Sequence, residues 1–591
     1  MMLNLTRAHC TRLGVILIPL AVGCWSNDTS TNPPVSLTKN PCTGAESVTI
    51  PALQSTRLDC GNGGTTVTLS GNGASYIVVP EFATGTGADQ LITYRMFAGS
   101  GSAASIAVTG SRLVSSNPTT GAAQMIGAAG ALPAYRPNRA QLAMDRALQQ
   151  RARAHLTQRG HGNILRPSLD VVPSAAVVPA VGSVRPFHVL SNLSTGAFSL
   201  VGARLAYAGA NVLVYVDTLS PANGFTSDQL QRFGDYFDQT LYSLAVNAFG
   251  GPSDVDANGH VIMLMSPVVN ADTPASTCAT QGFVGGFFMS DDFNGASDPN
   301  SNRGEIFYSI VPDPAATVSC AHTVDGLGQD IPATFLHELQ HLINYSQHVV
   351  INGGSDGASW IDEGMSIVAE EMGSLYWENK CPPPACRTNA AQIFPDSAQG
   401  FVQSFLYDSY QYALLPDTAS VTLHVDSDDG FAWRGGDWLL MRWLGDQLGG
   451  NVYKQLEHGP ADGVTAIEQA TGRTFPSLFA DFGLSLYTDS LPGLPRNSAP
   501  ATNRFTTRNV KQLWARLYAT SAGTDVPRPD PLQVFPITTD SSLSVMVPGT
   551  TTFFQIDTPA SASEVTIQFS GAAGAPFAAA LHPQIAVFRV K

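Results

Sequence analysis

The segment at residues 333–345 constrains the fold of this chain more than any other, because it places the spacing H-E-x-x-H inside a run of apolar residues. Its titratable residues are His337, Glu338 and His341. Residues four apart lie one above the other on an α-helix, so both imidazoles can converge on one metal ion. Glu338 lies about 100° around the helix, where its carboxylate can reach a metal-bound water without binding the metal. The spacing therefore predicts a buried helix that carries part of a zinc site.

A catalytic zinc ion needs a third protein ligand, and a cluster of carboxylates follows the first segment. Asp362, Glu363, Glu370 and Glu371 lie in the segment 359–371. Glu363 is predicted to be the third ligand of one zinc ion per chain. Glu370 lies seven residues further on and shares the same helical face, so Glu370 and Asp362 are predicted to contact the ligating imidazoles. A solvated helix end for Glu370 and Glu371, and a helix N-cap for Asp362, remain the alternatives.

These two segments resemble the gluzincin metallopeptidases, which carry H-E-x-x-H and a downstream Glu in an Asn-Glu-Gly-like turn, often with a further Glu seven residues on. The resemblance rests on the motif at 337–341 and on Trp-Ile-Asp-Glu-Gly-Met-Ser-Ile-Val-Ala-Glu at 360–370. The chain looks closest to the hyicolysin-like family of secreted bacterial neutral metallopeptidases, over about residues 205–490. The segment 435–449 is similar to the helix that packs behind such sites. The chain departs from the pattern at residue 362, where Asn is usual, and in the slightly longer spacing before the downstream Glu.

The resemblance implies an exported zinc-dependent endopeptidase that hydrolyses peptide bonds with a metal-activated water and Glu338 as the general base. No Gly-x-Met-Glu-Asn segment, which grips a free amino terminus in exopeptidases, occurs upstream of the motif. A surface-anchored binding or adhesion lipoprotein that retains the peptidase fold is the alternative function, and a zinc-dependent esterase is a third. The reaction also needs a donor for the oxyanion. The candidate donors follow the downstream Glu and are Tyr407, Tyr410, Tyr412 and His424.

The first residues predict export. Two arginines precede an apolar run at residues 13–22, and Cys24 follows it. A basic start, about ten apolar residues and a small residue at the exit are typical of a secretory signal peptide. Residues 1–24 are therefore predicted to be a signal peptide with a lipobox-like end, whose Cys24 becomes a lipid anchor at the membrane surface; ordinary cleavage nearby is the alternative. The polar residues 25–43 are a predicted linker, and the protein is expected at the bacterial cell envelope or secreted.

Cysteine usage agrees with export. Besides Cys10 and Cys24, six of the 8 cysteines remain. An even number of cysteines in an exported chain indicates disulfides. Pairing of sequence neighbours predicts the bridges 42–60, 278–320 and 381–386, among about fifteen possible connectivities.

The chain is predicted to be multidomain, with an α+β zincin-type metallopeptidase domain flanked by N- and C-terminal β-sandwich-like domains. Short apolar runs with Gly-rich turns predict strands within residues 44–110. Residues 111–186 are a predicted linker with a basic helix at 139–153, either solvated or part of a removable propeptide hinge. The metallopeptidase domain is expected at 187–500 and the C-terminal β domain at 501–591.

Within the central domain, apolar runs predict strands at 210–217, 260–265 and 305–310. An apolar face predicts a helix at 228–247, and further helices are expected from residue 331 to about 487. The strand at 305–310 is expected to offer its edge to an extended peptide.

The net charge and a second acidic motif bear on which partners and ions the chain can bind. The chain has 31 Lys and Arg residues against 46 Asp and Glu residues, which argues against a nucleic-acid partner and leaves proteins and peptides as the expected substrates. Residues 254–259 read Asp-Val-Asp-Ala-Asn-Gly and begin like a calcium loop, but the twelfth position is Met265, where a bidentate Glu belongs. A β-turn is the favoured interpretation and a partial calcium (Ca²⁺) site is the alternative. The sequence makes no prediction of the oligomeric state.

Overall fold

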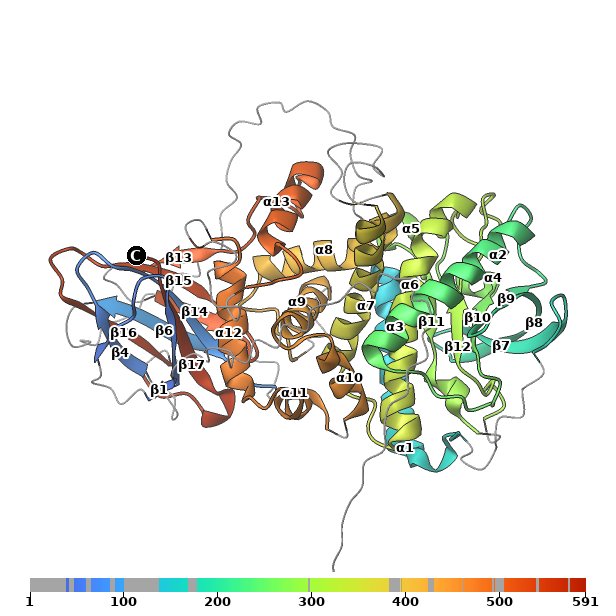
Figure 1. Cartoon of the computed structure of the whole chain (residues 1–591), viewed down its shortest axis with the longest axis horizontal. Helices are drawn as coiled ribbons and strands as arrows, with labels where there is room; N and C mark the ends of the chain where they lie inside the picture. The colour runs from blue at the N-terminus through green and yellow to red at the C-terminus, as the bar shows by residue number, and fades with distance from the viewer. Residues whose placement is uncertain are drawn as a thin grey trace, which may run out of the picture. The chain divides into compact units, whose positions relative to one another are not determined.

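The computed structural model describes one compact unit within residues 36–591 (Figure 1). Several predicted features lie outside the described residues: the signal peptide, Cys24, most of the polar linker and His424. Among the described helices, none is long and apolar enough to cross a membrane. The described residues are 39–41, 47–59, 65–85, 91–99, 138–167, 178–295, 298–381, 394, 396–423, 430–459, 461–491, 494, 504–537, 542–571 and 574–591.

Strands from the two ends of the chain form two sheets that share one apolar core. These strands are β1 (Lys39–Pro41), β2 (Ser47–Val48), β3 (Ser55–Asp59), β4 (Thr65–Ser70), β5 (Ser75–Phe82), β6 (Ile92–Gly99), β13 (Val534–Pro536), β14 (Ser542–Met546), β15 (Phe553–Asp557), β16 (Glu564–Gly571) and β17 (Pro583–Arg589). One sheet has the order β1-β3-β17-β5-β15-β13, and the other has the order β14-β6-β16-β4-β2. Blue N-terminal strands and red C-terminal strands are therefore interleaved within this sandwich (Figure 1).

The prediction of separate N- and C-terminal β-sandwich-like domains is wrong, because the two strand sets complete each other. β17 pairs with β3 on one side and with β5 on the other, so that Ile585 lies opposite both Leu58 and Pro80. β16 likewise lies between β4 and β6. Either strand set alone would leave these edges unpaired and much of the apolar core exposed. The region 501–591 also contains a helix that was not expected, α13 (Val510–Ser521).

A third sheet carries the strands of the central region. Its strands are β7 (Val184–Asn192), β8 (Ala197–Ala208), β9 (Val212–Asp217), β10 (Val261–Met265), β11 (Gly286–Phe288) and β12 (Ile306–Ser309). Their order is β11-β12-β10-β9-β8-β7, with β9, β10 and β12 parallel and β11 antiparallel to β12. β9, β10 and β12 confirm the three strands predicted here. Every residue of β10 is buried, as expected for a strand that is covered on both faces.

The prediction that the strand at 305–310 offers its edge to an extended peptide is wrong. β12, which corresponds to the predicted strand at 305–310, lies between β10 and β11. Its backbone groups are therefore used within the sheet, and β11 is the strand at this edge of the described sheet.

Four helices form the buried bundle that carries the motif: α6 packs on α7 and α8, and α9 packs on α7 and α8. Their bounds are α6 (Val324–Tyr345), α7 (Ser359–Lys380), α8 (Gln399–Leu414) and α9 (Phe431–Leu448). The Thr323 side chain caps α6 by accepting a hydrogen bond from the Gly326 N–H, 3.1 Å away. Gly435 allows the close approach of α9 to α8, because a Cβ at this position would collide with the backbone of Asp408.

Shorter helices complete the fold. The predicted helix at 228–247 is confirmed, with a π-helical turn, η2 (Phe237–Leu241), between α2 and α3. Helices also fill most of the described part of 331–487, as predicted. The remaining helical elements are α1 (Arg139–Arg159), η1 (Gly160–Asn163), α2 (Ser227–Tyr236), α3 (Tyr242–Phe249), α4 (Pro267–Ala271), α5 (Cys278–Gln281), η3 (Ser290–Phe293), η4 (Ser346–Ile351), η5 (Asp396–Ala398), α10 (Asn451–His458), α11 (Gly463–Thr471), α12 (Phe475–Thr488) and η7 (Ala579–Leu581).

One predicted disulfide is confirmed: Cys278 is bonded to Cys320. Cys381 is also disulfide-bonded. Its predicted partner, Cys386, and both cysteines of the predicted 42–60 bridge lie outside the described residues.

Candidate metal centre

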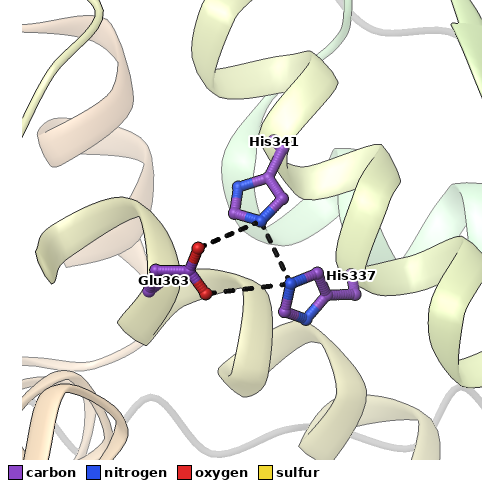
Figure 2. A group of neighbouring side chains, drawn as sticks. All are labelled: His337, His341 and Glu363. Atoms are coloured by element: carbon purple, nitrogen blue, oxygen red, sulfur yellow. Dashed lines mark hydrogen bonds and ion pairs between the residues drawn. The ribbon is translucent and has the colours of Figure 1, made fainter. Parts of the chain in front are cut away.

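Three buried side chains on two helices converge on one point (Figure 2). His337 and His341 lie one helical turn apart on α6, and Glu363 lies in the first turns of α7. The Nε2 atoms of the two imidazoles are 3.0 Å apart. The Glu363 oxygens lie 3.9 Å from His337 Nε2 and 3.8 Å from His341 Nε2. The structure thus brings together the three residues that were predicted as zinc ligands.

The outer nitrogens of both imidazoles face carboxylates. His337 Nδ1 lies 2.7 Å from Glu370 Oε1, and His341 Nδ1 lies 2.9 Å from Asp362 Oδ2. An imidazole that donates its Nδ1–H to a carboxylate carries a lone pair on Nε2. These contacts place Glu370 and Asp362 where the sequence predicted them, and the hydrogen bond to Glu370 favours the tautomer of His337 whose Nε2 is an electron donor.

The donor set fits a divalent cation. Two Nε2 lone pairs and a carboxylate point at one another, and such groups repel unless a cation lies between them. Glu363 Oε2 also lacks a hydrogen-bond partner within the described part of the chain. Two imidazoles and one carboxylate are a ligand set that zinc uses in catalytic sites. This buried group can therefore bind a metal ion such as zinc.

Glu338 lies beside these donors and is 3% exposed. Its Oε2 accepts a hydrogen bond from the Phe288 N–H of β11, at 2.8 Å, whereas its Oε1 has no partner among the residues that the structure describes. Burial raises the pKa of the Glu338 carboxyl well above its usual range, and the nearby Asp145 raises it further. A carboxyl with a raised pKa in a cleft is suited to proton transfer.

The helix α1 closes the cleft in front of the metal donors. Gln149 Nε2 donates a hydrogen bond to Glu363 Oε1 at 2.6 Å. Asp145, Leu148, Gln149 and Ala152 of α1 line a cavity of about 40 Å³ together with residues of the site, among them Glu338 and His341. The interpretation of this basic helix as a solvated linker is wrong, because its apolar side is buried in the main core.

Two further groups of the site were missed in the sequence. Arg434 of α9 is 6% exposed and lies 3.5 Å from Glu363 Oε2 and 3.3 Å from Asp145 Oδ2. Burial lowers the pKa of Arg434, but Glu363 and Asp145 more than offset this, so the guanidinium stays charged. Arg434 is one of two arginines in the apolar run 431–448, and a cation in such a run was the signal that could have found it. No feature of the sequence distinguishes Gln149 from the other glutamines of its helix.

The predicted oxyanion donors lie elsewhere, as far as they are described. Tyr410 donates its hydroxyl to the Arg528 carbonyl at 2.6 Å and accepts from the Arg528 N–H at 3.1 Å. Tyr412 is fully buried, and Tyr407 packs edge-on against Phe431. None of the three tyrosines belongs to the described residues that line the cavity. The three tyrosines lie on one helix, α8, but their positions in the sequence did not show that their side chains point away from the cavity.

A second group of carboxylates involves the predicted calcium loop. One oxygen from each of Asp254, Asp256 and Glu305 lies within 4.8 Å of the others. Glu305 precedes β12 and is 1% exposed. Its Oε1 accepts hydrogen bonds from the Ser253 hydroxyl and the Val255 N–H, whereas its Oε2 has no partner among the described residues. The fold therefore adds a distant carboxylate to the loop, in place of the acidic residue that its twelfth position lacks.

Comparisons with known proteins agree with this site. No protein family model matches the chain. The chain is 29% identical over 357 residues to the neutral metalloprotease ShpI of Staphylococcus hyicus, an alignment that covers 56% of this chain and 69% of that protein. Together with the buried donor group, this similarity indicates a metallopeptidase.

Proposed function

We propose that this protein is an exported zinc-dependent endopeptidase that uses Glu338 as its general base. The observation that carries the proposal is the convergence of two imidazole Nε2 atoms and the Glu363 carboxylate beside a second carboxylate with an unpartnered oxygen in the described structure. The similarity to a neutral metalloprotease supports the same conclusion.

The residues have separate roles in this reaction. His337, His341 and Glu363 would hold the zinc ion, which when bound polarises the scissile carbonyl and acidifies a water molecule. Glu338 Oε1 takes the proton of the attacking water and gives it to the leaving amine. The Phe288 N–H holds Glu338 Oε2 in place during both transfers.

Export remains part of the proposal. The Cys278–Cys320 disulfide supports an oxidising compartment. Lipidation of Cys24 and attachment to a membrane surface rest on the sequence alone, since Cys24 lies outside the described residues.

Casein hydrolysis by the zinc-loaded protein tests the proposed function. We expect peptide-bond cleavage that stops when a chelator removes the metal and returns when zinc is restored. A binding or adhesion lipoprotein would bind polymers without cleaving them, and an esterase would turn over esters without cleaving casein. The proposal is wrong if no peptide bond is cleaved by the zinc-loaded wild type or by the zinc-loaded variant Gln141→Ala/Gln149→Ala. This variant lacks two side-chain amides through which α1 contacts β11 and Glu363.

Glu370 is expected to tune the metal affinity through His337. Its Oε1 lies 2.7 Å from His337 Nδ1, and its Oε2 accepts a hydrogen bond from the Ser404 hydroxyl at 2.8 Å. Glu370→Gln should weaken zinc binding by about 10–100-fold, because the amide is a poorer acceptor for the imidazole N–H. Competition with a chromophoric chelator measures the affinity. Ser404→Ala is the control with a smaller expected loss, and an unchanged affinity in Glu370→Gln would remove the residue from the site.

We also propose that Asp254, Asp256 and Glu305 form a calcium site. Glu305 is buried and the two aspartates are half-buried, so their mutual repulsion leaves a concentration of negative charge that a hard cation would relieve. Burial, together with the two nearby aspartates, raises the pKa of Glu305 to about 7. Calcium should raise the melting temperature of the wild type but not that of Glu305→Gln. The control is Glu378→Gln, which replaces a carboxylate that pairs with Arg508, and it should respond like the wild type. Equal calcium responses in all three proteins would exclude the site.

A further inference from the structure

We propose that α1 is an autoinhibitory helix that holds the protein latent by occupying the substrate side of the metal centre. The proposal rests on the peptidase function proposed above and adds its regulation. It is carried by contacts at three places along one helix: at the metal donors, at the edge strand and at the charged residues around the cleft.

The first contact uses a predicted metal ligand directly. Gln149 donates its side-chain amide to Glu363 Oε1, the oxygen that lies nearest His341 Nε2. Leu148 and Ala152, one turn apart, are buried against the same cavity. These side chains of α1 line the cavity of about 40 Å³ that also contains Glu338 and His341. With α1 docked, the Gln149 amide is bonded to Glu363 on the side from which a substrate would approach Glu338 and the metal donors.

The second contact occupies backbone hydrogen-bonding groups at the start of the edge strand β11 and in the residues just before it. Gln141 Oε1 accepts from the Gly285 N–H at 2.9 Å, and Gln141 Nε2 donates to the Gly286 carbonyl at 2.8 Å. Asn138 Oδ1 accepts from the Phe283 N–H at 3.0 Å. An extended peptide that added to β11 would use backbone groups of this kind. The side chains of α1 therefore replace a substrate strand at the edge next to Glu338.

The third set of contacts is ionic. Asp145 pairs with Arg434, the guanidinium that also lies beside Glu363. Arg151 and His155 both contact Asp291 of η3, with N–O distances of 2.6 Å and 3.1 Å. These pairs fix α1 along the cleft in a single register.

The segment 178–184 lies between α1 and the central sheet. All residues at 178–184 are exposed, including Val178, Val181 and Val184, but Gly182 and Ser183 share backbone hydrogen bonds with Leu205 of β8. The exposed chain ahead of this pairing, at 178–181, is the part that a peptidase can reach. A cut in this segment would separate α1 from the central sheet, which begins at β7.

Two pairs of glutamines on α1 provide a matched test. Gln141→Ala/Gln149→Ala removes the amides that contact β11 and Glu363, whereas Gln150→Ala/Gln158→Ala removes two exposed amides from the same helix. Alanine preserves helix propensity in both variants. Because a hydrogen bond to a charged group contributes about tenfold or more to an equilibrium, we expect the first variant to raise peptide hydrolysis at least about tenfold over the wild type. The second variant should match the wild type.

Binding of a dipeptide hydroxamate to the zinc-loaded protein gives a readout that does not need turnover. Its affinity, measured by calorimetry, should rise at least about tenfold in Gln141→Ala/Gln149→Ala and stay at the wild-type value in the control. Ala147→Pro, which breaks α1 in its middle, should raise hydrolysis and hydroxamate affinity at least as much. Zinc content and melting temperature report whether each variant is folded and loaded.

The outcomes separate latency from function. If wild type and both α1 variants hydrolyse peptides and bind hydroxamate equally well, α1 is not inhibitory, while the peptidase function stands. If hydroxamate affinity rises in the α1 variants but no form cleaves a peptide, α1 does cover the site and the proposed reaction is wrong.

Discussion

Glu338→Gln is expected to reduce peptide hydrolysis by about 10²–10⁴-fold while the zinc content stays at one ion per chain. The Glu338 side chain is not one of the three converging donors, so its loss should not release the metal. The amide keeps the size of the carboxyl but cannot take a proton from water. Its oxygen can still accept the hydrogen bond from the Phe288 N–H.

The assay should compare this substitution with a carboxylate outside the cleft. Glu378 of α7 pairs with Arg508 and is not among the described residues of the cavity, so Glu378→Gln is expected to retain activity. Both substitutions belong on the Gln141→Ala/Gln149→Ala background as well as on the wild type, because α1 covers the cleft. Equal hydrolysis by the Glu338→Gln and Glu378→Gln proteins would remove Glu338 from the reaction.

Glu363→Ala is expected to lower zinc affinity by more than about 100-fold, a larger loss than removal of an outer hydrogen-bonding group produces. The substitution removes one of three ligands and also removes a carboxylate that balances the buried charge of Arg434. The buried positive charge would then repel the metal ion. Zinc content after dialysis, measured by mass spectrometry, should fall close to zero.

A retained zinc ion in Glu363→Ala would move the third ligand to a neighbouring carboxylate. Glu370 is the nearer candidate, because it already contacts His337. Glu371 is turned away, where it accepts hydrogen bonds from Trp438 and Arg508. Comparing Glu363→Ala with Glu370→Gln therefore separates the ligand from the residue that orients a ligand.

The metal donors could be predicted because their geometry is local. The spacing of His337 and His341 fixes a shared helical face, and the spacing of Glu363 and Glu370 does the same on the second helix. The sequence does not say that the two helices pack together, but a catalytic zinc ion requires it. The same local periodicity located the buried strands β9, β10 and β12.

Features that depend on distant pairing could not be predicted in this way. Ile585 lies opposite Leu58 across more than half of the chain, and alternation along each strand says nothing about its partner. Glu305 joins the calcium loop only because β12 lies beside β10. The contacts of α1 with the site could not be predicted either, since Gln141 and Gln149 make them through side-chain amides, which are usually solvated.

The central claim is that His337, His341 and Glu363 hold one zinc ion. Anomalous diffraction at the zinc edge, from crystals of the zinc-loaded protein, tests this claim most directly. The account predicts a single strong peak between the Nε2 atoms of the two imidazoles and the Glu363 carboxylate. A zinc-loaded crystal with its peak at another group of residues, and none between these three side chains, would contradict it.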